Sequence, residues 1–415
     1  MELGKYSWGI GDRFSHQAEA QLKALLLARQ AGLDIVPVWN KSNREHLFIH
    51  SEPLTTRLAA DNAVKKLEWK GSYFCDADHI NMSNVDRFLD SCDFFTLDVA
   101  DYIGKEAEEE EIEAFVAANS DYTGYLIIPG ILAPYMVSDD DLRQIARKFL
   151  YAIRQAAIIY KHIAAHKGES NFITEVSMDE VNDPQTPIEL FFILSAIAYY
   201  GIPAQTIAPK FTGRFNKGVD YVGDVDQFAR EFEEDLKVID FAVQEFVLPE
   251  NLKLSIHSGS DKFSIYPVMG NLIKKYDKGL HVKTAGTTWL EEIIGLAMAG
   301  GDGLYLAKRV YAEAYANRRE MTLPYATVID IHPNRLPTPD EVNGWDGDRF
   351  AQTLRHVQEN PYYNPDFRQL IHVAFKVAAN LGVTYTDALV QYAELVGEQV
   401  TENLYERHIR RLFGV

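Results

Sequence analysis

The chain has 415 residues, 47% hydrophobic and 24% charged, a composition typical of a globular protein. Its 41 Lys and Arg against 60 Asp and Glu residues give a net charge of −19, which argues against nucleic acid as a partner because such a chain repels phosphate. Two cysteines, Cys75 and Cys92, are too few for a disulfide framework or a thiolate zinc site, and no signal peptide or membrane-spanning stretch is evident, so we expect a soluble, reduced, cytoplasmic protein.

Short apolar runs alternate with segments of helical periodicity over the first two thirds of the chain. The runs predicted to be strands cover residues 7–11, 34–39, 72–75, 94–98, 171–177, 205–211, 253–257 and 280–283. The helices predicted between them cover residues 17–30, 55–69, 140–166, 186–200, 224–246 and 261–276. Because parallel strands need crossover connections, this alternation predicts an α/β fold with a parallel sheet, and eight strands favour a closed (β/α)8 TIM barrel.

Two stretches do not fit plain strand–helix units. The segment 98–131 contains the acidic run EAEEEEIE at 106–113, which is typical of a solvated helix face or loop, and we predict an insertion after the fourth strand. From residue 304 the chain is mostly helical, most clearly over 366–381 and 386–412, and no linker precedes it. We therefore predict a catalytic barrel over 1–303 and a helical C-terminal extension over 304–415 that packs on the barrel.

The third predicted strand ends in the polar sequence CDADH at 75–79. Carboxylates and a neutral imidazole suit a divalent metal or proton transfer. Because neighbours on a strand point to opposite faces, Asp78 and His79 can face one site only if the strand has already ended. A helix-capping aspartate with a surface histidine is the structural alternative.

Glu175 lies inside the apolar fifth strand, where an unpaired carboxylate is costly. Such a group must be paired, bound to a metal or protonated, and each state shifts its pKa, as an acid or base in catalysis requires. A buried salt bridge is the structural alternative.

The seventh and eighth strands are each followed by small polar residues. His257 is a candidate metal ligand, and Ser258 begins the segment SGS at 258–260, before a predicted helix. The eighth strand ends in Lys283 and Thr284, followed by another predicted helix start. Hydroxyls and backbone N–H groups at helix N-termini bind anions, and in TIM barrels these loops often hold a phosphate, although a carboxylate would fit equally. Ordinary capping is the structural alternative.

Other polar residues at predicted strand ends or in the tail are weaker candidates. No P-loop, dinucleotide fingerprint, G-x-S-x-G elbow or H-E-x-x-H helix is present in the sequence. The weaker candidates are Asp12, Arg13, Asn40, Lys41, Asp98, Lys210, Asp220, and the pair Arg368 and His372, which would share one helix face and could cover the barrel mouth.

The chain resembles the tagaturonate epimerase family in a series of motifs that keep their order. They are GDR at 11–13, DADH at 76–79, EVSMDE at 175–180, KGVDY at 217–221, HSGSDKFS at 257–264, HVKTAGT at 281–287 and RQLIHV at 368–373. The resemblance implies a metal-dependent epimerase that interconverts D-tagaturonate and D-fructuronate. It implies Asp78 and Glu175 as the acid/base pair and His79 and His257 as ligands of a divalent metal (Ni, Mn, Co or Zn), with Asp220 as the expected third ligand.

The two sugar acids differ at a carbon one position removed from the carbon next to the ketone. Epimerisation there without a redox cofactor can proceed by retro-aldol cleavage and re-addition or by direct proton removal and return, and both routes need a Lewis acid and two acid/base groups. We expect the substrate to contact Arg13, Lys210, Ser258, Lys283, Thr284 and His372.

Two other functions remain open at this stage. One is an epimerase or class II aldolase-type enzyme acting on a neutral ketose or another uronate, and the other is a non-catalytic sugar-acid binding protein. We expect a small sugar acid as the partner, with neither nucleic acid nor membrane, and a homo-oligomer remains open.

Overall fold

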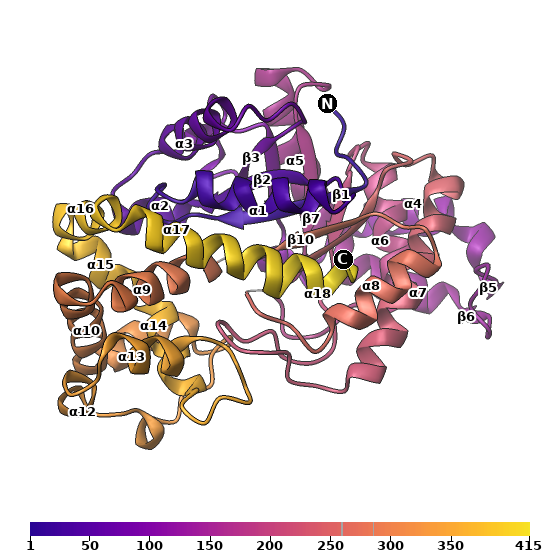
Figure 1. Ribbon diagram of the computed structural model, residues 1–415. Helices are drawn as coiled ribbons and strands as arrows, with labels where there is room; N and C mark the ends of the chain where they lie inside the picture. The colour runs from indigo at the N-terminus through magenta and orange to yellow at the C-terminus, as the bar shows by residue number, and fades with distance from the viewer. Residues whose placement is uncertain (259, 285) are drawn as a thin grey trace.

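The computed structural model describes residues 1–258, 260–284 and 286–415, and its centre is a closed barrel of parallel strands (Figure 1). The strands follow the order β1-β10-β9-β8-β7-β4-β3-β2 around the barrel. Their bounds are β1 (Tyr6–Gly11), β2 (Val36–Ser42), β3 (Phe74–Ile80), β4 (Phe94–Asp98), β7 (Ile173–Ser177), β8 (Thr206–Ala208), β9 (Lys253–His257) and β10 (Leu280–Lys283). The predicted (β/α)8 TIM barrel is confirmed.

Helices cover the outside of the barrel between successive strands. They are α1 (Ala18–Gln30), α3 (Pro53–Lys66), α5 (Asp139–Lys167), α6 (Pro187–Tyr199), α7 (Val225–Phe246) and α8 (Tyr266–Lys275). Capping residues set several of the starts: Ser138 and Thr186 each accept a hydrogen bond from the backbone three residues later, and Pro187 occupies the first turn of α6. A short 3-10 turn, η1 (Val85–Arg87), connects β3 to β4.

Several predicted elements differ from the structure in their bounds, and two of the differences concern helices around the barrel. A seven-residue helix, α2 (Asn43–Ile49), follows β2 and begins with a capping box between Ser42 and Glu45, which sequence periodicity did not reveal because the helix is only two turns long. The helix expected from residue 261 begins only at Tyr266. Asp261 is fully buried and bonds to Arg368, so tertiary contacts hold this segment outside the helix.

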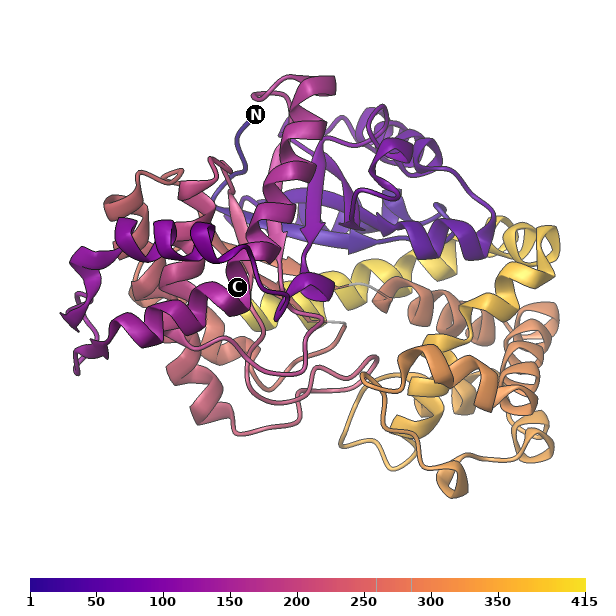
Figure 2. The same ribbon diagram turned by 180° about the vertical axis from the view of Figure 1, so that it is seen from behind.

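The insertion after β4 projects from the side of the barrel opposite the C-terminal lobe (Figure 2). It contains η2 (Ala100–Tyr102), α4 (Glu109–Ala118), η3 (Ser120–Tyr122) and the antiparallel pair β5 (Gly124–Leu126) and β6 (Tyr135–Val137). The acidic run forms α4, whose glutamates pair with arginines of α5, such as Glu109 with Arg147 at 3.0 Å and Glu113 with Arg143 at 2.7 Å. The acidic face of α4 therefore lies against basic side chains of α5.

Most of the C-terminal region forms a helical lobe with its own apolar core. Its elements are α9 (Thr287–Ala299), α10 (Gly301–Ala316), α11 (Arg318–Thr322), η4 (Leu323–Tyr325), η5 (Pro333–Arg335), α12 (Pro339–Asn343), α13 (Gly347–Leu354), α14 (Pro365–Val373), α15 (Phe375–Leu381) and α16 (Val383–Gln391). The helix that follows β10, α9, packs with α10, α13 and α17. It thus belongs to the lobe core, although its residues lie before position 304.

The end of the chain completes the helical layer of the barrel. α17 (Ala393–Glu402), the π-helical segment η6 (Asn403–Ile409) and α18 (Arg410–Phe413) run beside α1 and reach α8 (Figure 1). Leu404, Ile409 and Leu412 belong to the barrel's own core. The last helices therefore occupy the place between α8 and α1 that an eighth barrel helix would fill. Within the described ranges, no helix is both long and apolar enough to cross a membrane.

Candidate active site

A cavity of about 640 Å³ lies at the carboxyl ends of the barrel strands. Asp78, Asp98 and His257 line it from strand ends, and Tyr325 and Phe375 line it from the C-terminal lobe. This is the end of the barrel where the sequence placed the chemistry, since TIM barrels carry active sites there. The lobe closes one side of the mouth.

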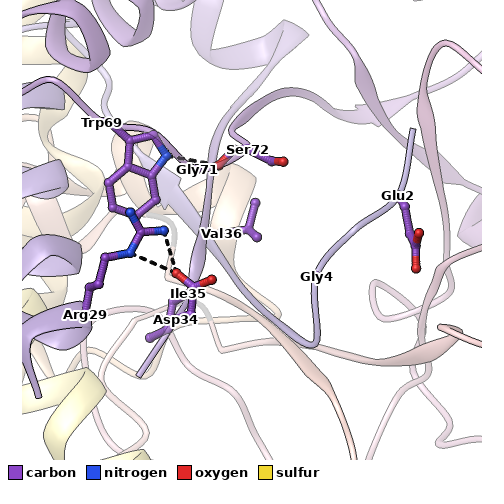
Figure 3. A pocket seen from close by; sticks show the side chains of 9 residues that line it. All are labelled: Glu2, Gly4, Arg29, Asp34, Ile35, Val36, Trp69, Gly71 and Ser72. Carbon is purple, nitrogen blue, oxygen red and sulfur yellow. Dashed lines mark hydrogen bonds and ion pairs between the residues drawn. The ribbon is translucent and has the colours of Figure 1, made fainter. Parts of the chain in front are cut away.

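A second hollow of about 480 Å³ lies near the start of β2 (Figure 3). Arg29 pairs there with Asp34 at 2.6 Å and stacks on Trp69 at 3.9 Å from the ring centroid. None of the predicted site residues lines this hollow. The strand-end cavity is therefore the candidate active site.

A β-bulge brings both Asp78 and His79 to the cavity. The register between β3 and β4 shifts between Ala77 and Ile80, and His79 adopts a left-handed φ of 51°. The strand continues through both residues to Ile80, so the bulge, and not the end of the strand, turns the two side chains to one side. A left-handed backbone at a non-glycine residue costs free energy and persists where the surrounding structure imposes it.

His79, Asp179 and His257 form a group that could hold a metal ion. One ligand atom from each lies within 4.8 Å of the others, and a second such group is His79, Asp98 and Glu180. The Nδ1 atoms of His79 and His257 are buried, and each faces a carboxylate, Asp98 at 3.5 Å and Asp179 at 3.1 Å. Two imidazoles and a carboxylate are a donor set that divalent transition metals prefer. These residues therefore fit a bound cation.

The charges around the two histidines also favour a cation. Burial lowers the pKa of His257, but Asp179 and Glu175 offset this and raise it to about 9. Burial likewise opposes the charged form of His79, yet Asp78, Asp98 and Asp179 raise its pKa well above the usual value. Surroundings that stabilise an imidazolium also stabilise a divalent ion, because both respond to the same carboxylates.

Glu175 lies behind the cavity wall in a buried network around Lys283. Glu175 is 0% exposed, and its Oε1 lies 2.8 Å from Lys283 Nζ and 2.9 Å from His257 Nε2. The hydroxyl of Thr206 donates to Oε2 at 2.7 Å. Burial alone would raise the pKa of Glu175, but Lys283 and His257 hold it well below its usual range. The carboxylate is thus ionised and fully hydrogen-bonded.

Asp78 and Asp76 bind the same ammonium from β3. Lys283 Nζ lies 2.9 Å from Asp78 Oδ1 and 2.7 Å from Asp76 Oδ2. Burial raises the pKa of Asp76 to about 7 despite Lys283, whereas Lys283 and His79 outweigh burial at Asp78 and lower its pKa to about 2. Neighbouring carboxylates with separated pKa values are typical of acid/base sites.

Sequence reasoning missed Asp76 and Asp179. Asp76 precedes Asp78 by two residues and shares its face of β3, so the period of two along a strand could have revealed it. Asp179 follows the end of β7 by two residues, within the motif EVSMDE, and Ser177 donates to its Oδ1 at 2.6 Å. A polar residue just past a strand end is the signal that would have found it.

The predicted anion site after β9 and β10 is used differently. Lys283 is bound by three carboxylates, so its charge is already balanced. Ser258 Oγ donates to the Lys283 carbonyl at 2.8 Å, and Thr284 Oγ1 accepts from Trp8 Nε1 at 3.1 Å. The helix expected to begin at residue 261, directly after the segment 258–260, begins only at Tyr266, so this segment does not precede a helix N-terminus directly. Gly259 and Ala285, which belong to the predicted loops, lie outside the described residues.

Asp220 lies apart from the candidate metal ligands. It accepts hydrogen bonds from the backbone N–H groups of Tyr221 at 2.7 Å and Ser264 at 3.1 Å, which ties the β8–α7 loop to the segment before α8. Asp220 does not line the cavity, and it belongs to neither of the two candidate ligand groups among the described residues. Asp179, and not Asp220, lies beside His79 and His257.

The remaining candidates divide between the cavity wall and the interior. Arg13 and Lys210 line the cavity, and Arg13 Nε donates to Glu45 at 2.9 Å. Arg368 and His372 do not line it. Arg368 is bound to Asp261, and His372 is buried against Gly218 and Gly286. The pair on α14 thus supports the wall of the cavity from behind.

Comparisons with known proteins agree over nearly the whole chain. The family model for tagaturonate epimerase, UxaE, matches residues 1–413. A tagaturonate/fructuronate epimerase from Thermotoga maritima is 28% identical over 426 residues, which cover 98% of this chain and 81% of that protein. The glycerol-bound crystal structure of fructuronate-tagaturonate epimerase UxaE from Cohnella laeviribosi superposes with a TM-score of 0.80 at 22% identity, covering 100% of this chain and 82% of that one. Its native form gives 0.78.

Proposed function

The chain belongs to the tagaturonate epimerase family and is therefore an isomerase, and from that premise we propose that it interconverts D-tagaturonate and D-fructuronate with a divalent metal and a carboxylate acid/base pair. The observation that carries the proposal is the group His79, Asp179 and His257 beside Asp78 in the strand-end cavity. A non-catalytic binding protein would not need a proton-transfer group next to such ligands.

His79, Asp179 and His257 would hold the metal in this proposal. When bound, a divalent ion polarises substrate oxygens and stabilises negative charge that develops on them. Glu175 accepts from His257 Nε2 and so orients the ring whose Nδ1 faces Asp179 at 3.1 Å. Carboxylates that hold a ligating imidazole in this way raise its basicity and fix its tautomer.

Asp78 is the group that we assign to contact the substrate. It is ionised, it lines the cavity, and Lys283 Nζ bonds to both Asp78 and Glu175. Glu175 is fully buried, so we propose that it exchanges protons with the cavity through Lys283, which reaches the cavity wall. The three groups form one proton-transfer unit.

A retro-aldol route suits this unit best. The ketone does not acidify the C–H bond at the epimerised carbon, whereas the hydroxyl on that carbon can lose its proton to an ionised carboxylate. The bond to the α-carbon then breaks, leaving an aldehyde and an enediolate. Rotation of the aldehyde and re-addition reform the bond with inverted configuration, and the proton returns to the new alkoxide.

Proton NMR of the purified chain with D-fructuronate in deuterated water tests the function and the route together. With Ni, Mn, Co or Zn added in turn, we expect D-tagaturonate to appear, with protium retained at the epimerised carbon. Chelation should abolish the reaction and re-addition of metal should restore it. Absence of turnover with every cation would reject the epimerase proposal, and deuterium at that carbon would reject only the retro-aldol route.

A further inference from the structure

The cavity is lined both by acidic side chains, among them the candidate metal ligands, and by basic ones. The lysines and arginines that line it are Arg13, Arg44, Lys210, Arg214, Lys217 and Lys283. Three carboxylates neutralise Lys283, and Arg214 pairs with Asp330 at 3.6 Å. A sugar acid carries its carboxylate at one end and its ketone near the other, and this lining offers cationic groups for the first and candidate metal ligands for the second.

Lys217 is held rigidly at its backbone, while its ammonium lies 5.9 Å from the centroid of the Tyr325 ring and forms no ion pair with the described residues. Its N–H donates to the Val328 carbonyl at 2.8 Å, and the N–H of the next residue, Gly218, donates to Ser260 Oγ at 2.9 Å. Gly218 has a φ of +78° and its carbonyl accepts from Arg368 Nε at 2.6 Å. Among the described residues, Lys217 Nζ has neither an ion-pair nor a hydrogen-bond partner within reach.

Arg13 presents a second unused donor to the same wall. Its Nε is bonded to Glu45, but its Nη1 is buried and has no hydrogen-bond partner in the described ranges, and the residue is 8% exposed. Burial and the positive charges of Arg44 and Arg13 lower the pKa of Lys217, while Glu180 opposes the shift. The positive charges of Lys217, Arg13 and Arg44 repel one another, and an anion bound between them would reduce that repulsion.

We propose that Lys217, together with Arg13, binds the carboxylate of the sugar acid and thereby sets the preference for uronates over neutral ketoses. This inference rests on the proposed function. The sequence suggested Lys283 as the cation that binds the substrate carboxylate. We assign that role to Lys217 instead, because Lys217 forms no ion pair with the described residues. An arginine and a lysine with fixed positions give charge-assisted hydrogen bonds, which are stronger than neutral ones.

The test compares Lys217→Met and Lys217→Arg with the wild type in the metal-loaded enzyme. The substrates are D-fructuronate and the ketose in which a hydroxymethyl group replaces its carboxylate; the ketose is measured as a competitive inhibitor if it is not turned over. Lys217→Met should raise KM for the uronate about tenfold or more, and the ketose constant should change less than about twofold. Lys217→Arg should recover most of the uronate affinity.

Arg214→Gln is the matched control. It removes a cation that also lines the cavity but is already paired with Asp330. We expect it to change neither constant by more than about twofold, because exposed pairs contribute little. The subsite is wrong if Lys217→Met leaves the uronate KM unchanged, or if it raises both constants equally. A wild type that epimerises no uronate would instead reject the proposed function.

Discussion

At the residue scale, the bulge at Asp78 and His79 decides what β3 can do. A regular strand would send these neighbours to opposite faces, and the left-handed backbone at His79 brings both side chains to the cavity, as the proposed roles of a proton-transfer group and a metal ligand require. The sequence identified both side chains but not the bulge, because no glycine or proline marks it. The paired roles therefore depend on a backbone feature that only the structure reveals.

Replacing Asp78 by Asn should lower kcat by about a hundredfold or more, the usual contribution of a general acid or base. The amide keeps the shape of the side chain, and the variant should retain its metal because Asp78 is in neither ligand group. Metal content and near-UV circular dichroism serve as controls. An Asp78→Asn enzyme with wild-type kcat and full metal content would remove this residue from the mechanism.

Asp179 and Asp220 are alternative candidates for the third ligand of the proposed metal site. The structure favours Asp179, which lies with His79 and His257, and the sequence favoured Asp220, which instead bonds to Ser264. Asp179→Asn should weaken metal binding by at least about tenfold, measured by competition with a chromogenic chelator. Asp220→Asn should leave the affinity within about twofold. The reverse result would restore the sequence-based assignment.

At the element scale, the sequence predicted the number and order of the barrel strands, but not all of their bounds, and it predicted the shorter helices poorly. Most strands are apolar and lie on a regular strand–helix repeat, so their places follow from local pattern, whereas the third strand covers 74–80 and not 72–75, because its polar end is part of the strand. α2 is short and half polar, and the start of α8 depends on Asp261, which bonds to His356, Arg368 and other groups far along the chain. Local sequence does not contain those partners, so a boundary that they determine could not be predicted.

α2 carries a buried neutral histidine that links stability to pH. Burial and the charge of Lys41 lower the pKa of His46 from 6.5 to about 3, while the ring bonds to Ser51 Oγ at 2.8 Å. A depressed folded-state pKa means that the unfolded chain binds more protons below pH 6.5. The stability contribution is therefore complete above pH 6.5 and declines as the pH falls from 6.5 towards 3.

Between pH 7.5 and 5.5 this histidine should account for about 1.3 kcal/mol of lost unfolding free energy. His46→Gln should flatten the decline by that amount, whatever its effect at pH 7.5, in urea unfolding of the metal-saturated protein. Saturation with metal keeps His79 and His257 from adding their own titration. An unchanged slope in the variant would show that His46 is protonated in the folded state.

At the scale of the whole molecule, the last residues of the chain complete the helical layer around the barrel. Trp8 of β1 packs against His408, and Tyr6 packs against Phe413 at 4.8 Å between ring centroids. Thr401 Oγ1 donates to the Ala20 carbonyl of α1 at 2.9 Å. The helix after β10 leaves the barrel to build the lobe over the cavity, and the C-terminal helices cover the barrel face that it does not. The chain therefore leaves the barrel after β10 and returns to it at its C-terminal end.

Two glycines test this closure with matched substitutions. In α8, a Cβ at Gly270 would overlap the backbone oxygen of Leu412 in α18, so the two helices can pack only if residue 270 has no side chain. In α17, a Cβ at Gly397 would make an ordinary contact of 3.5 Å with the Cβ of Ala20. Both sites are helical, so Ala improves helix propensity equally at each.

Gly270→Ala should therefore lower the unfolding free energy by about 1–3 kcal/mol, the usual cost of overpacking a well-packed contact, whereas Gly397→Ala should be neutral or stabilise by up to about 1 kcal/mol. Urea unfolding of both variants measures the difference, and limited proteolysis should cleave the C-terminal helices faster in Gly270→Ala. Equal stabilities would mean that α18 is not seated on α8 in solution. The place between α8 and α1 in the helical layer would then be open to solvent or filled by another group.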